Sequence, residues 1–318
     1  MDASLRDLLL AELGDGEGGI VVWHRAAAGE EPEREAVGEQ SPLEGGGPLA
    51  PTVPTRIGSI TKTFVATVVM QLVEEGALSL DDPIADHLPD HPFAASGPAE
   101  PLTVRHLLSH RSGIANYTDL PTFFPDVDGD PDRVWTPEEI VDLVADTPAQ
   151  PGAPFAYSNT NYIVLGQLIE AIEGESAGDV IARRITTPLG LDTIDLATES
   201  ADDTAIVSTA WTAGAMRSSA DDLAAFIEAL AAGDVVSADS LAAMTDIDPA
   251  SIETGGYGLG LLAVGVNPDE VGWGHGGGIP GGISFVAHFP DTGETVVILS
   301  TYEFVDLAGL LEAILEPA

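Results

Sequence analysis

The sequence predicts an α/β (α+β) fold in which an antiparallel sheet, flanked by helices, is formed from both termini and an all-helical subdomain is inserted between them. Between residues 80 and 200 apolar residues recur mostly with helical spacing, joined by Pro-rich connections. Strand-like runs of β-branched and aromatic residues lie towards the two ends, at residues 20–25, 257–266, 283–289 and 295–301. We therefore expect a discontinuous sheet domain of residues 1–80 and 201–318, and a helical subdomain of residues 81–200.

The N-terminal elements follow from local patterns. Residues 1–13 are expected to form a short amphipathic helix. They are not expected to be a signal peptide, because they lack its basic start and its small-residue cleavage site. Residues 20–25 follow as a strand, and the Gly- and Pro-rich residues 26–54 as a hairpin and loop. Apolar residues 60–73 then fall on one helical face, and Gly76 ends that helix.

Four further helices are predicted along the rest of the chain. The clearest runs are Ile140–Val144 and Tyr162–Ile172, and the second stops at Gly174. Another helix begins after Ser219, whose side chain can cap it. A final helix covers Leu307–Leu315. The strands that precede it complete the expected sheet.

The charge of the chain indicates an unusual environment. The 318 residues include 52 acidic and 11 basic ones, a formal charge of −41 that is spread along the whole length. Molar salt shortens the Debye length to about 3 Å and screens the self-repulsion of such a chain. We therefore expect a halophilic protein, with an ordinary acidic protein as the alternative. Nucleic acid and anionic membranes are poor partners for this surface.

Other features of the composition narrow the class of protein. The chain has no cysteine and is 44% hydrophobic, so we expect a sizeable core without disulfides or thiolate metal sites. No apolar stretch approaches the roughly 18 residues of a membrane span. Without a signal peptide, a soluble cytoplasmic protein is the expectation. The oligomeric state stays open.

A single lysine persists against the acidic bias. This residue is Lys62, three positions after Ser59 and in the first turn of the same predicted helix. Arginine stays protonated at any ordinary pH, whereas a desolvated lysine can lose its proton and act as a base. A lysine one turn after a serine therefore indicates an activated serine nucleophile.

Three short motifs occur in the order Ser59-x-x-Lys62, Tyr157-Ser158-Asn159 and His275-Gly276-Gly277. This trio resembles the serine β-lactamase and penicillin-binding-protein superfamily, in the branch of class C β-lactamases, D,D-carboxypeptidases and β-lactamase-like esterases. Eight segments between residues 55 and 301 carry the resemblance: TRIGSITKTF, LSLDDPIADHLP, LTVRHLLSHRSGI, PGAPFAYSNTNYIVLG, PLGL, SSADDLAAF, GYGLG and GHGGGIPG.

The resemblance implies a β-lactamase/transpeptidase-like fold with the active site at the interface of the two domains. It implies a serine hydrolase that acts through an acyl-enzyme on a small ester or amide, with no cofactor and no metal. Ser59 would be the nucleophile, Lys62 its base, and Tyr157 the phenol that shuttles a proton to the leaving group. The N–H groups of Ser59 and Gly278 would form the oxyanion hole.

The other matched residues are expected to bind substrate. Asn159 would place its carboxamide beside Lys62, and His275 to Gly277 would lie on an inner edge strand, where glycine lets a substrate approach closely. Many relatives have threonine at Gly276, where its hydroxyl can bind a substrate carboxylate, so carboxylate substrates are disfavoured here. His275 stands where some relatives have lysine and would supply a pH-dependent positive charge.

Several alternatives stay open. Among enzymes they are a true β-lactamase and a D-amino-acid peptidase; in another class, a non-catalytic binding protein could retain the fold. Intact Ser59, Lys62 and Tyr157 weigh against the binding protein. An α/β-hydrolase is disfavoured, because the sequence has no G-x-S-x-G motif.

Two other patterns are expected not to bind a metal. His106 and His110 have i, i+4 spacing, but no third ligand is evident. A second segment has Pro131 where an EF-hand loop requires glycine, so a solvated acidic loop is expected there. Its alternating carboxylates are Asp126, Asp128, Asp130 and Asp132.

Overall fold

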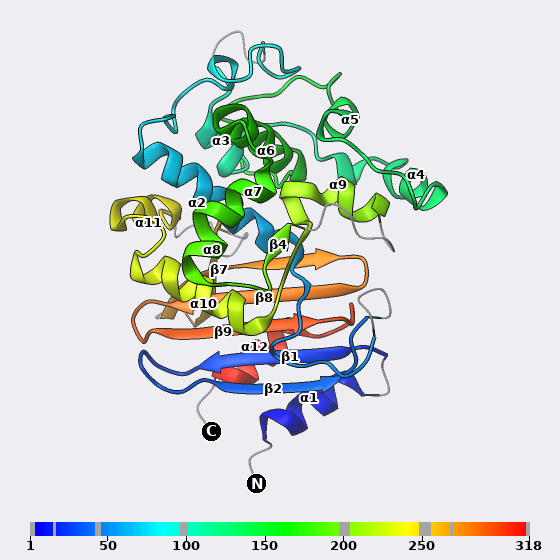
Figure 1. Ribbon diagram of the computed structural model, residues 1–318, viewed down its shortest axis with the longest axis vertical. Helices are drawn as coiled ribbons and strands as arrows, with labels where there is room; N and C mark the ends of the chain where they lie inside the picture. The colour runs from blue at the N-terminus through cyan, green and yellow to red at the C-terminus, as the bar shows by residue number, and fades with distance from the viewer. Residues whose placement is uncertain are drawn as a thin grey trace.

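The computed structural model describes residues 4–14, 17–41, 46–95, 101–196, 204–247, 256–267 and 270–315. A six-stranded antiparallel sheet lies at one end of the molecule, and most of the helices gather beside and above it (Figure 1). The strand order is β2-β1-β9-β8-β7-β6, so the N-terminal hairpin pairs with the C-terminal strands. This confirms the predicted fold class.

A second sheet consists of three short strands in the order β3-β5-β4. The strands are β1 (Gly19–Arg25), β2 (Glu33–Gly38), β3 (Thr55–Arg56), β4 (Asp195–Leu196), β5 (Met216–Ser218), β6 (Leu262–Asn267), β7 (Glu270–Ile279), β8 (Gly282–Phe289) and β9 (Glu294–Ser300).

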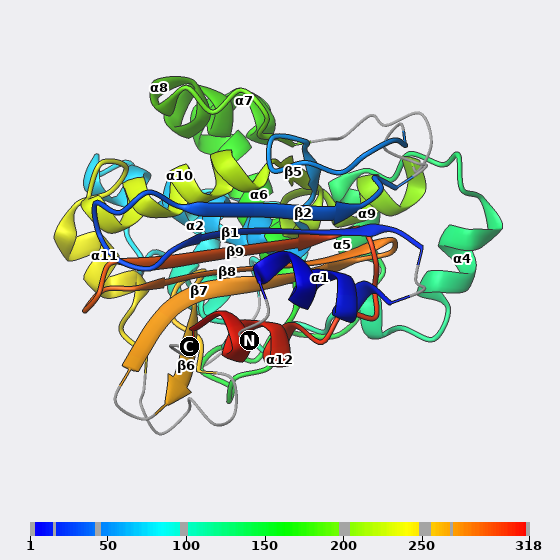
Figure 2. The same ribbon diagram turned by 90° about the horizontal axis from the view of Figure 1, so that it is seen from below.

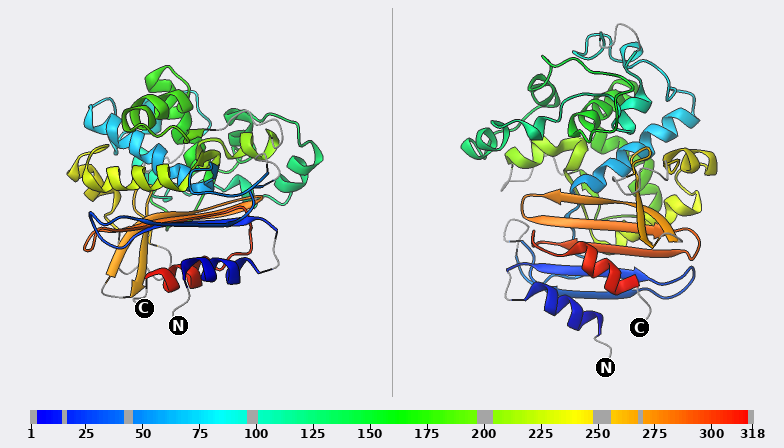
Figure 3. Two further views of the ribbon diagram at one scale, coloured as in Figure 1. Left: turned by 60° about the horizontal axis from the view of Figure 1, so that its bottom comes forward. Right: turned by 180° about the vertical axis from the view of Figure 1, so that it is seen from behind.

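Helices cover both faces of the large sheet. Alternation along β1 turns Ile20 and Val22 to the face covered by α1 and α12, and turns Val21 and Trp23 to the main helical core. Figure 2 shows α1 and α12 side by side on one face, with α10 and α2 on the other. The first and last residues that the structure describes, next to α1 and α12, lie on this same face (Figure 3).

The helical layer is built around two long helices, α2 and α6, whose residues are largely buried. The α-helices are α1 (Leu5–Leu13), α2 (Thr61–Glu74), α3 (Val104–Leu108), α4 (Phe123–Gly129), α5 (Pro137–Asp142), α6 (Asn159–Glu173), α7 (Ala177–Ile181), α8 (Thr187–Leu189), α9 (Thr204–Gly214), α10 (Ala220–Ala232), α11 (Ala238–Met244) and α12 (Leu307–Leu315). Shorter turns are η2 (Gly58–Ile60), η3 (Ile84–Asp86), η4 (Tyr117–Asp119) and the π-turn η5 (Ala182–Thr186).

Several predicted helix boundaries agree with the structure because they depend on local chemistry. The α6 helix ends at Gly174, which adopts a left-handed φ of 70°. The side chain of Ser219 accepts a hydrogen bond from the backbone of Asp222 and caps α10. The α1 helix, by contrast, begins at Leu5 inside the predicted residues 1–13, where the side chain of Ser4 caps it.

Three local predictions were wrong. The strand expected from residue 257 begins at Leu262, because Tyr257 makes only an isolated bridge. Ser59 lies in the η2 turn that leads into α2, not inside the α-helix. The expected acidic loop is instead partly helical, as α4. Asp126 and Asp128 are exposed there. Because they are two residues apart, their side chains point to different sides of the helix.

The boundary predicted at residue 200 lies outside the described residues, and the domain limits stay a prediction. Among the residues that the structure describes, no helix is both long enough and apolar enough to cross a membrane.

Candidate active site

The turn that carries Ser59 brings it to the start of the central helix α2. Gly58 precedes it with a left-handed φ of 49°, a conformation that glycine adopts readily. Ser59 stays partly exposed and lines a pocket, whereas Lys62, one turn later, is completely buried. The sequence therefore folds locally so that an accessible hydroxyl stands in front of a buried amine.

Lys62 Nζ has three oxygen neighbours. It lies 3.0 Å from Ser59 Oγ, 2.8 Å from Asn159 Oδ1 and 2.6 Å from the carbonyl oxygen of Ala213. A neutral amine has two N–H donors and one lone pair. The Asn159 and Ala213 oxygens can accept the two N–H bonds, which leaves the lone pair for the proton of Ser59. The geometry suits a base acting on Ser59.

Burial also determines the protonation state of the amine. Desolvation lowers the pKa of Lys62 well below its usual range. Because the charged form is disfavoured, the free amine is populated at a lower pH than for an exposed lysine. Both the contacts and the lowered pKa therefore suit the predicted role of a general base.

Tyr157 lies in the extended segment before α6 and is partly buried. Its phenol lies near the Ser59 side chain, and its ring centroid lies 4.9 Å from Lys62 Nζ. Desolvation raises the pKa of Tyr157 above its usual value, against a smaller opposite effect of the nearby Ser59 side chain. The phenol therefore stays protonated at neutral pH and can pass a proton on, while Lys62 holds the lone pair.

Asn159 is the first residue of α6, and its carboxamide orientation is fixed by its neighbours. Oδ1 faces Lys62, so Nδ2 faces Thr118 and donates to its Oγ1 at 3.3 Å. The backbone N–H of Asn159 donates to Asn116 Oδ1 at 3.0 Å. The η4 turn thus holds Asn159 against Lys62.

The glycine-rich triplet lies on β7 beside the η2 turn. Strand β6 pairs with residues 270–274 of β7, whereas the rest of β7, from His275, pairs only with β8. A side chain at Gly58 would lie 2.7 Å from the backbone nitrogen of Gly278, so the two backbones are in contact. The N–H groups of Ser59 and Gly278 therefore come from adjacent segments, as an oxyanion hole requires.

Gly277 and Gly276 differ from the expectation that they border substrate. A Cβ on Gly277 would lie 2.1 Å from the carbonyl oxygen of Ile57, so this glycine accommodates the chain's own backbone. Gly276 has room for a side chain, because its nearest neighbour would be Ser284 O at 3.9 Å. Only Gly278 of the three lines the pocket by Ser59.

The positive charge predicted at His275 is wrong. The ring is buried, Nε2 lies 3.0 Å from Tyr257 Oη, and Nδ1 lies 2.6 Å from the carbonyl oxygen of Gly276. Desolvation, with a smaller contribution from Lys62, lowers the pKa of His275 to about 3. The imidazole is therefore neutral near pH 7, donates from Nδ1 and accepts from Tyr257.

His106 and His110 also have structural partners. His106 Nδ1 accepts from the backbone of Thr103 at the start of α3. His110 Nδ1 accepts from the backbone of Ser158 and lies 3.1 Å from Asn161 Nδ2. Among the described residues no group of three or more His, Cys, Asp or Glu side chains is placed to hold a metal ion.

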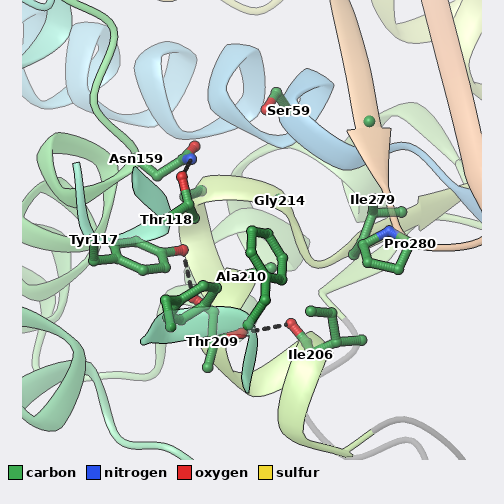
Figure 4. Close-up of a pocket in the computed structure, with 14 residues that line it drawn as sticks. Ser59, Tyr117, Thr118, Asn159, Ile206, Thr209, Ala210, Gly214, Ile279 and Pro280 are labelled. Atoms are coloured by element: carbon green, nitrogen blue, oxygen red, sulfur yellow. Dashed lines mark hydrogen bonds between the residues drawn. The ribbon is translucent and has the colours of Figure 1, made fainter. Parts of the chain in front are cut away.

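The pocket in front of Ser59 has a volume of about 100 Å³ and lies between α9, the η4 turn and the end of β7 (Figure 4). Uncharged side chains and backbone make up its described lining. Aromatic and aliphatic groups form one part of the wall, and Thr118 and Asn159 form another (Figure 4). The apolar part includes Tyr117, Phe123, Phe124, Ile206, Ile279 and Pro280.

Sequence reasoning missed the apolar wall of the pocket and also Gly58, Ala213 and Thr118. Gly58 directly precedes Ser59, and that adjacency was the available signal. Ala213 acts through its carbonyl oxygen and Thr118 through contacts with distant residues, so neither has a recognisable local pattern. Of the eight residues predicted for the site, Ser59, Asn159 and Gly278 line the pocket. Their functional roles stay predictions.

Comparison with known proteins assigns the family. The family model for the Beta-lactamase family matches residues 11–316, nearly the whole chain. The chain belongs to the Beta-lactamase family. This membership agrees with the resemblance carried by the three motifs. The matched residues also contain the strands and helices on which the motifs lie.

Solved structures similar to this Beta-lactamase family chain include two amide hydrolases. A D-stereospecific amidohydrolase from Streptomyces sp. has a TM-score of 0.84 and 30% identity, with 98% of each chain covered. The D-amino acid amidase of Ochrobactrum anthropi SV3 has a TM-score of 0.82 and 27% identity, covering 98% of this chain and 96% of that one. These neighbours support a serine hydrolase.

Among curated proteins, penicillin-binding protein 4 of Amycolatopsis lactamdurans is 39% identical over 134 residues. That alignment covers 42% of this chain and 34% of the relative. Penicillin-binding protein 4* of Bacillus subtilis is 31% identical over 43% of this chain and 29% of its own length. The aligned part of the chain thus spans about a third of these relatives.

Proposed function

We propose that the chain is a serine hydrolase that cleaves a small ester or amide through an acyl-enzyme. The arrangement around Lys62 Nζ carries the proposal. Its two acceptors, Asn159 Oδ1 and Ala213 O, leave the amine lone pair for Ser59, and its burial favours the free base. An ordinary structural lysine would not need a partly exposed serine as its third neighbour.

The proposed reaction has two balanced halves. Ser59 Oγ attacks the carbonyl carbon while its proton passes to Lys62 Nζ, and the oxyanion accepts hydrogen bonds from the N–H groups of Ser59 and Gly278. The bond to the leaving group then breaks, and the leaving group takes a proton through Tyr157, which is resupplied by Lys62. Water attacks the acyl-enzyme, gives a proton to restore the Ser59 hydroxyl, and releases the acid.

The substrate is proposed to be small and uncharged near the scissile bond, and no cofactor is needed for these steps. The described pocket lining carries no charged side chain, which supports this class. The amidase neighbours favour an amide of a D-amino acid as a second candidate, beside an ester. A true β-lactamase and a non-catalytic binder are the remaining alternatives. Nucleic acid and membranes are not proposed as partners.

A covalent probe tests the proposal directly. A fluorophosphonate should label the wild-type protein once, and peptide mapping should place the adduct on Ser59. The Ser59→Ala variant should remain unlabelled while keeping its circular dichroism spectrum. A folded wild-type protein without an adduct at Ser59 would support the binding protein instead.

Gly276 provides a test of substrate class. The variant Gly276→Thr should fold, because its Cβ meets only Ser284 O at 3.9 Å, and its hydroxyl can donate to a substrate carboxylate. We expect kcat/KM to rise by about 10- to 100-fold for substrates with a carboxylate beside the scissile bond, the value of one hydrogen bond to a charged group. Uncharged p-nitrophenyl esters serve as controls. Faster hydrolysis of penicillins than of these esters by the wild-type protein would contradict the proposed preference.

We also propose that the protein works at high salt, which its net charge of −41 supports. At low salt the negative potential should favour protonated Lys62 and raise its pKa. Because the base must be neutral, the acid limb of the kcat/KM profile should move to higher pH as salt falls from 1 M to 0.1 M. Circular dichroism must show a folded protein at each point. A limb that stays in place, or moves to lower pH, would disprove this coupling.

A further inference from the structure

The hydroxyl of Thr118 has an unusual set of neighbours. Its oxygen accepts a hydrogen bond from Asn116 Nδ2 at 2.7 Å and another from Asn159 Nδ2 at 3.3 Å. Both amide orientations are fixed independently. Asn116 Oδ1 accepts from the backbone of Asn159, and Asn159 Oδ1 faces Lys62. Both nitrogens must therefore face Thr118.

These two contacts occupy both lone pairs of the Thr118 oxygen. The hydroxyl hydrogen makes no hydrogen bond to any residue that the structure describes. Thr118 is partly exposed and lines the pocket in front of Ser59, beside Asn159 (Figure 4). The hydroxyl is therefore left as a donor for a ligand in that pocket.

The neighbouring hydroxyls of the pocket are already used. Tyr117 donates its phenol proton to the carbonyl oxygen of Thr209 at 2.6 Å, and Thr209 donates to Ile206 O at 2.9 Å. Phe123, Phe124 and other apolar groups surround them. Thr118 thus places a neutral donor beside a mostly apolar wall, which favours a ligand with a hydrogen-bond acceptor next to an apolar group.

We propose that Thr118 is a specificity-determining residue that donates a hydrogen bond to a neutral acceptor, such as an ether or carbonyl oxygen, on the acyl group of the substrate. This inference rests on the proposed hydrolysis at Ser59. The apolar part of the acyl group packs against the aromatic wall. An ammonium group at the same position cannot accept the Thr118 hydrogen and meets no carboxylate in the described lining. The preferred substrate therefore differs from an amino-acid amide with a free amine.

Three p-nitrophenyl esters of 3-phenylpropionic acid test the proposal: the unsubstituted ester, its α-methoxy derivative and its α-amino derivative. The quantity measured is the ratio of kcat/KM for the methoxy ester to that for the unsubstituted ester, for each enantiomer separately. This ratio should fall by about 3- to 10-fold in Thr118→Val, the value of one neutral hydrogen bond. Thr118→Ser, which keeps the hydroxyl, should retain the wild-type ratio.

The controls separate the possible failures. Thr118→Val also removes the acceptor for Asn159, so a common loss of kcat for all three esters is expected and cancels in the ratio. Thr209→Val removes a hydroxyl that already donates to Ile206 and should leave the ratio unchanged. The ratio of kcat/KM for the α-amino ester to that for the unsubstituted ester should not fall in Thr118→Val.

Two results would overturn the inference in different ways. In the first, hydrolysis depends on Ser59, but the ratio of kcat/KM for the methoxy ester to that for the unsubstituted ester is the same in the wild-type protein and Thr118→Val. This result would refute only the role of Thr118. Hydrolysis of all three esters at the same rate by Ser59→Ala, without an adduct in the wild-type protein, would refute the proposed function and the inference with it.

Discussion

Replacing Lys62 with arginine is expected to reduce kcat/KM to less than a tenth of the wild-type value. A guanidinium stays protonated at any ordinary pH, so it can donate to Asn159 and Ala213 but cannot accept the proton of Ser59. A tenfold loss corresponds to about 1.4 kcal/mol of transition-state stabilisation. The measurement is steady-state hydrolysis of a p-nitrophenyl ester, with Ser59→Ala as the inactive reference. Retention of more than a tenth of the activity by a folded Lys62→Arg protein would refute the assignment of the base.

The variant Lys62→Met separates the base from the fold. Methionine has a similar length and no charge, so activity should be lost while the chain still folds. Burial lowers the pKa of Lys62 below its unfolded value of about 10.4, and the unfolded state therefore binds the extra proton. Stability contributed by this site should increase with pH up to the unfolded pKa and decrease as pH falls towards the folded pKa.

The difference in unfolding free energy between the wild-type protein and Lys62→Met should accordingly change by up to about 1.4 kcal/mol per pH unit inside that window. Urea unfolding at several pH values and constant high salt measures it. Loss of donors to Asn159 and Ala213 shifts the whole curve without changing its slope. A difference that is independent of pH from 7 to 10 would mean that Lys62 is not desolvated as the structure indicates.

Replacing Gly58 with alanine is expected to lower kcat by about 10²- to 10³-fold, the effect of losing one oxyanion-hole donor. The new Cβ would lie 2.7 Å from the nitrogen of Gly278, so β7 and the η2 turn must separate. The two N–H groups could then no longer bind one oxygen together. The rate at which a fluorophosphonate phosphonylates Ser59 and kcat for ester hydrolysis both report this loss.

Gly76→Ala is the matched control for this substitution. Gly76 also has a positive φ, of 71°, but a Cβ there would have no neighbour within 4 Å. Both variants therefore carry similar backbone strain, and only Gly58→Ala disturbs the candidate oxyanion hole. Gly76→Ala should lose stability while retaining kcat. Equal losses of kcat in the two folded variants would show that strain, and not the contact with Gly278, explains the effect.

Local chemistry made much of the architecture predictable. The periodicity of α2 and α6, the cap at Ser219 and the left-handed glycine at Gly174 depend on neighbours within one or two helical turns. Clustering of strand-like segments at both ends was enough to predict one sheet made from the two termini. The boundaries that failed were at Tyr257, which makes only an isolated bridge with Leu262, and in α4, which forms where a loop was expected.

The same division applies to the candidate site. Scarcity of lysine and its spacing from Ser59 made that pair visible in the sequence, because an acidic bias leaves few reasons to keep an ammonium group. The protonation of His275 was not visible, since it depends on complete burial and on Tyr257. Its charge could be assigned only from the folded environment, where desolvation exceeds the intrinsic basicity of imidazole.

Residue types and their spacing therefore identified the fold class, the family resemblance and the candidate nucleophile of this chain. Folding was needed to bring Gly58 against Gly278, the carbonyl of Ala213 against Lys62, and Thr118 against Asn159. These contacts join segments far apart in the chain, and two of them use backbone atoms that every residue type provides. Hydrogen-bond partners and burial, which define the base, the oxyanion donors and the free hydroxyl, arise only when those segments pack together.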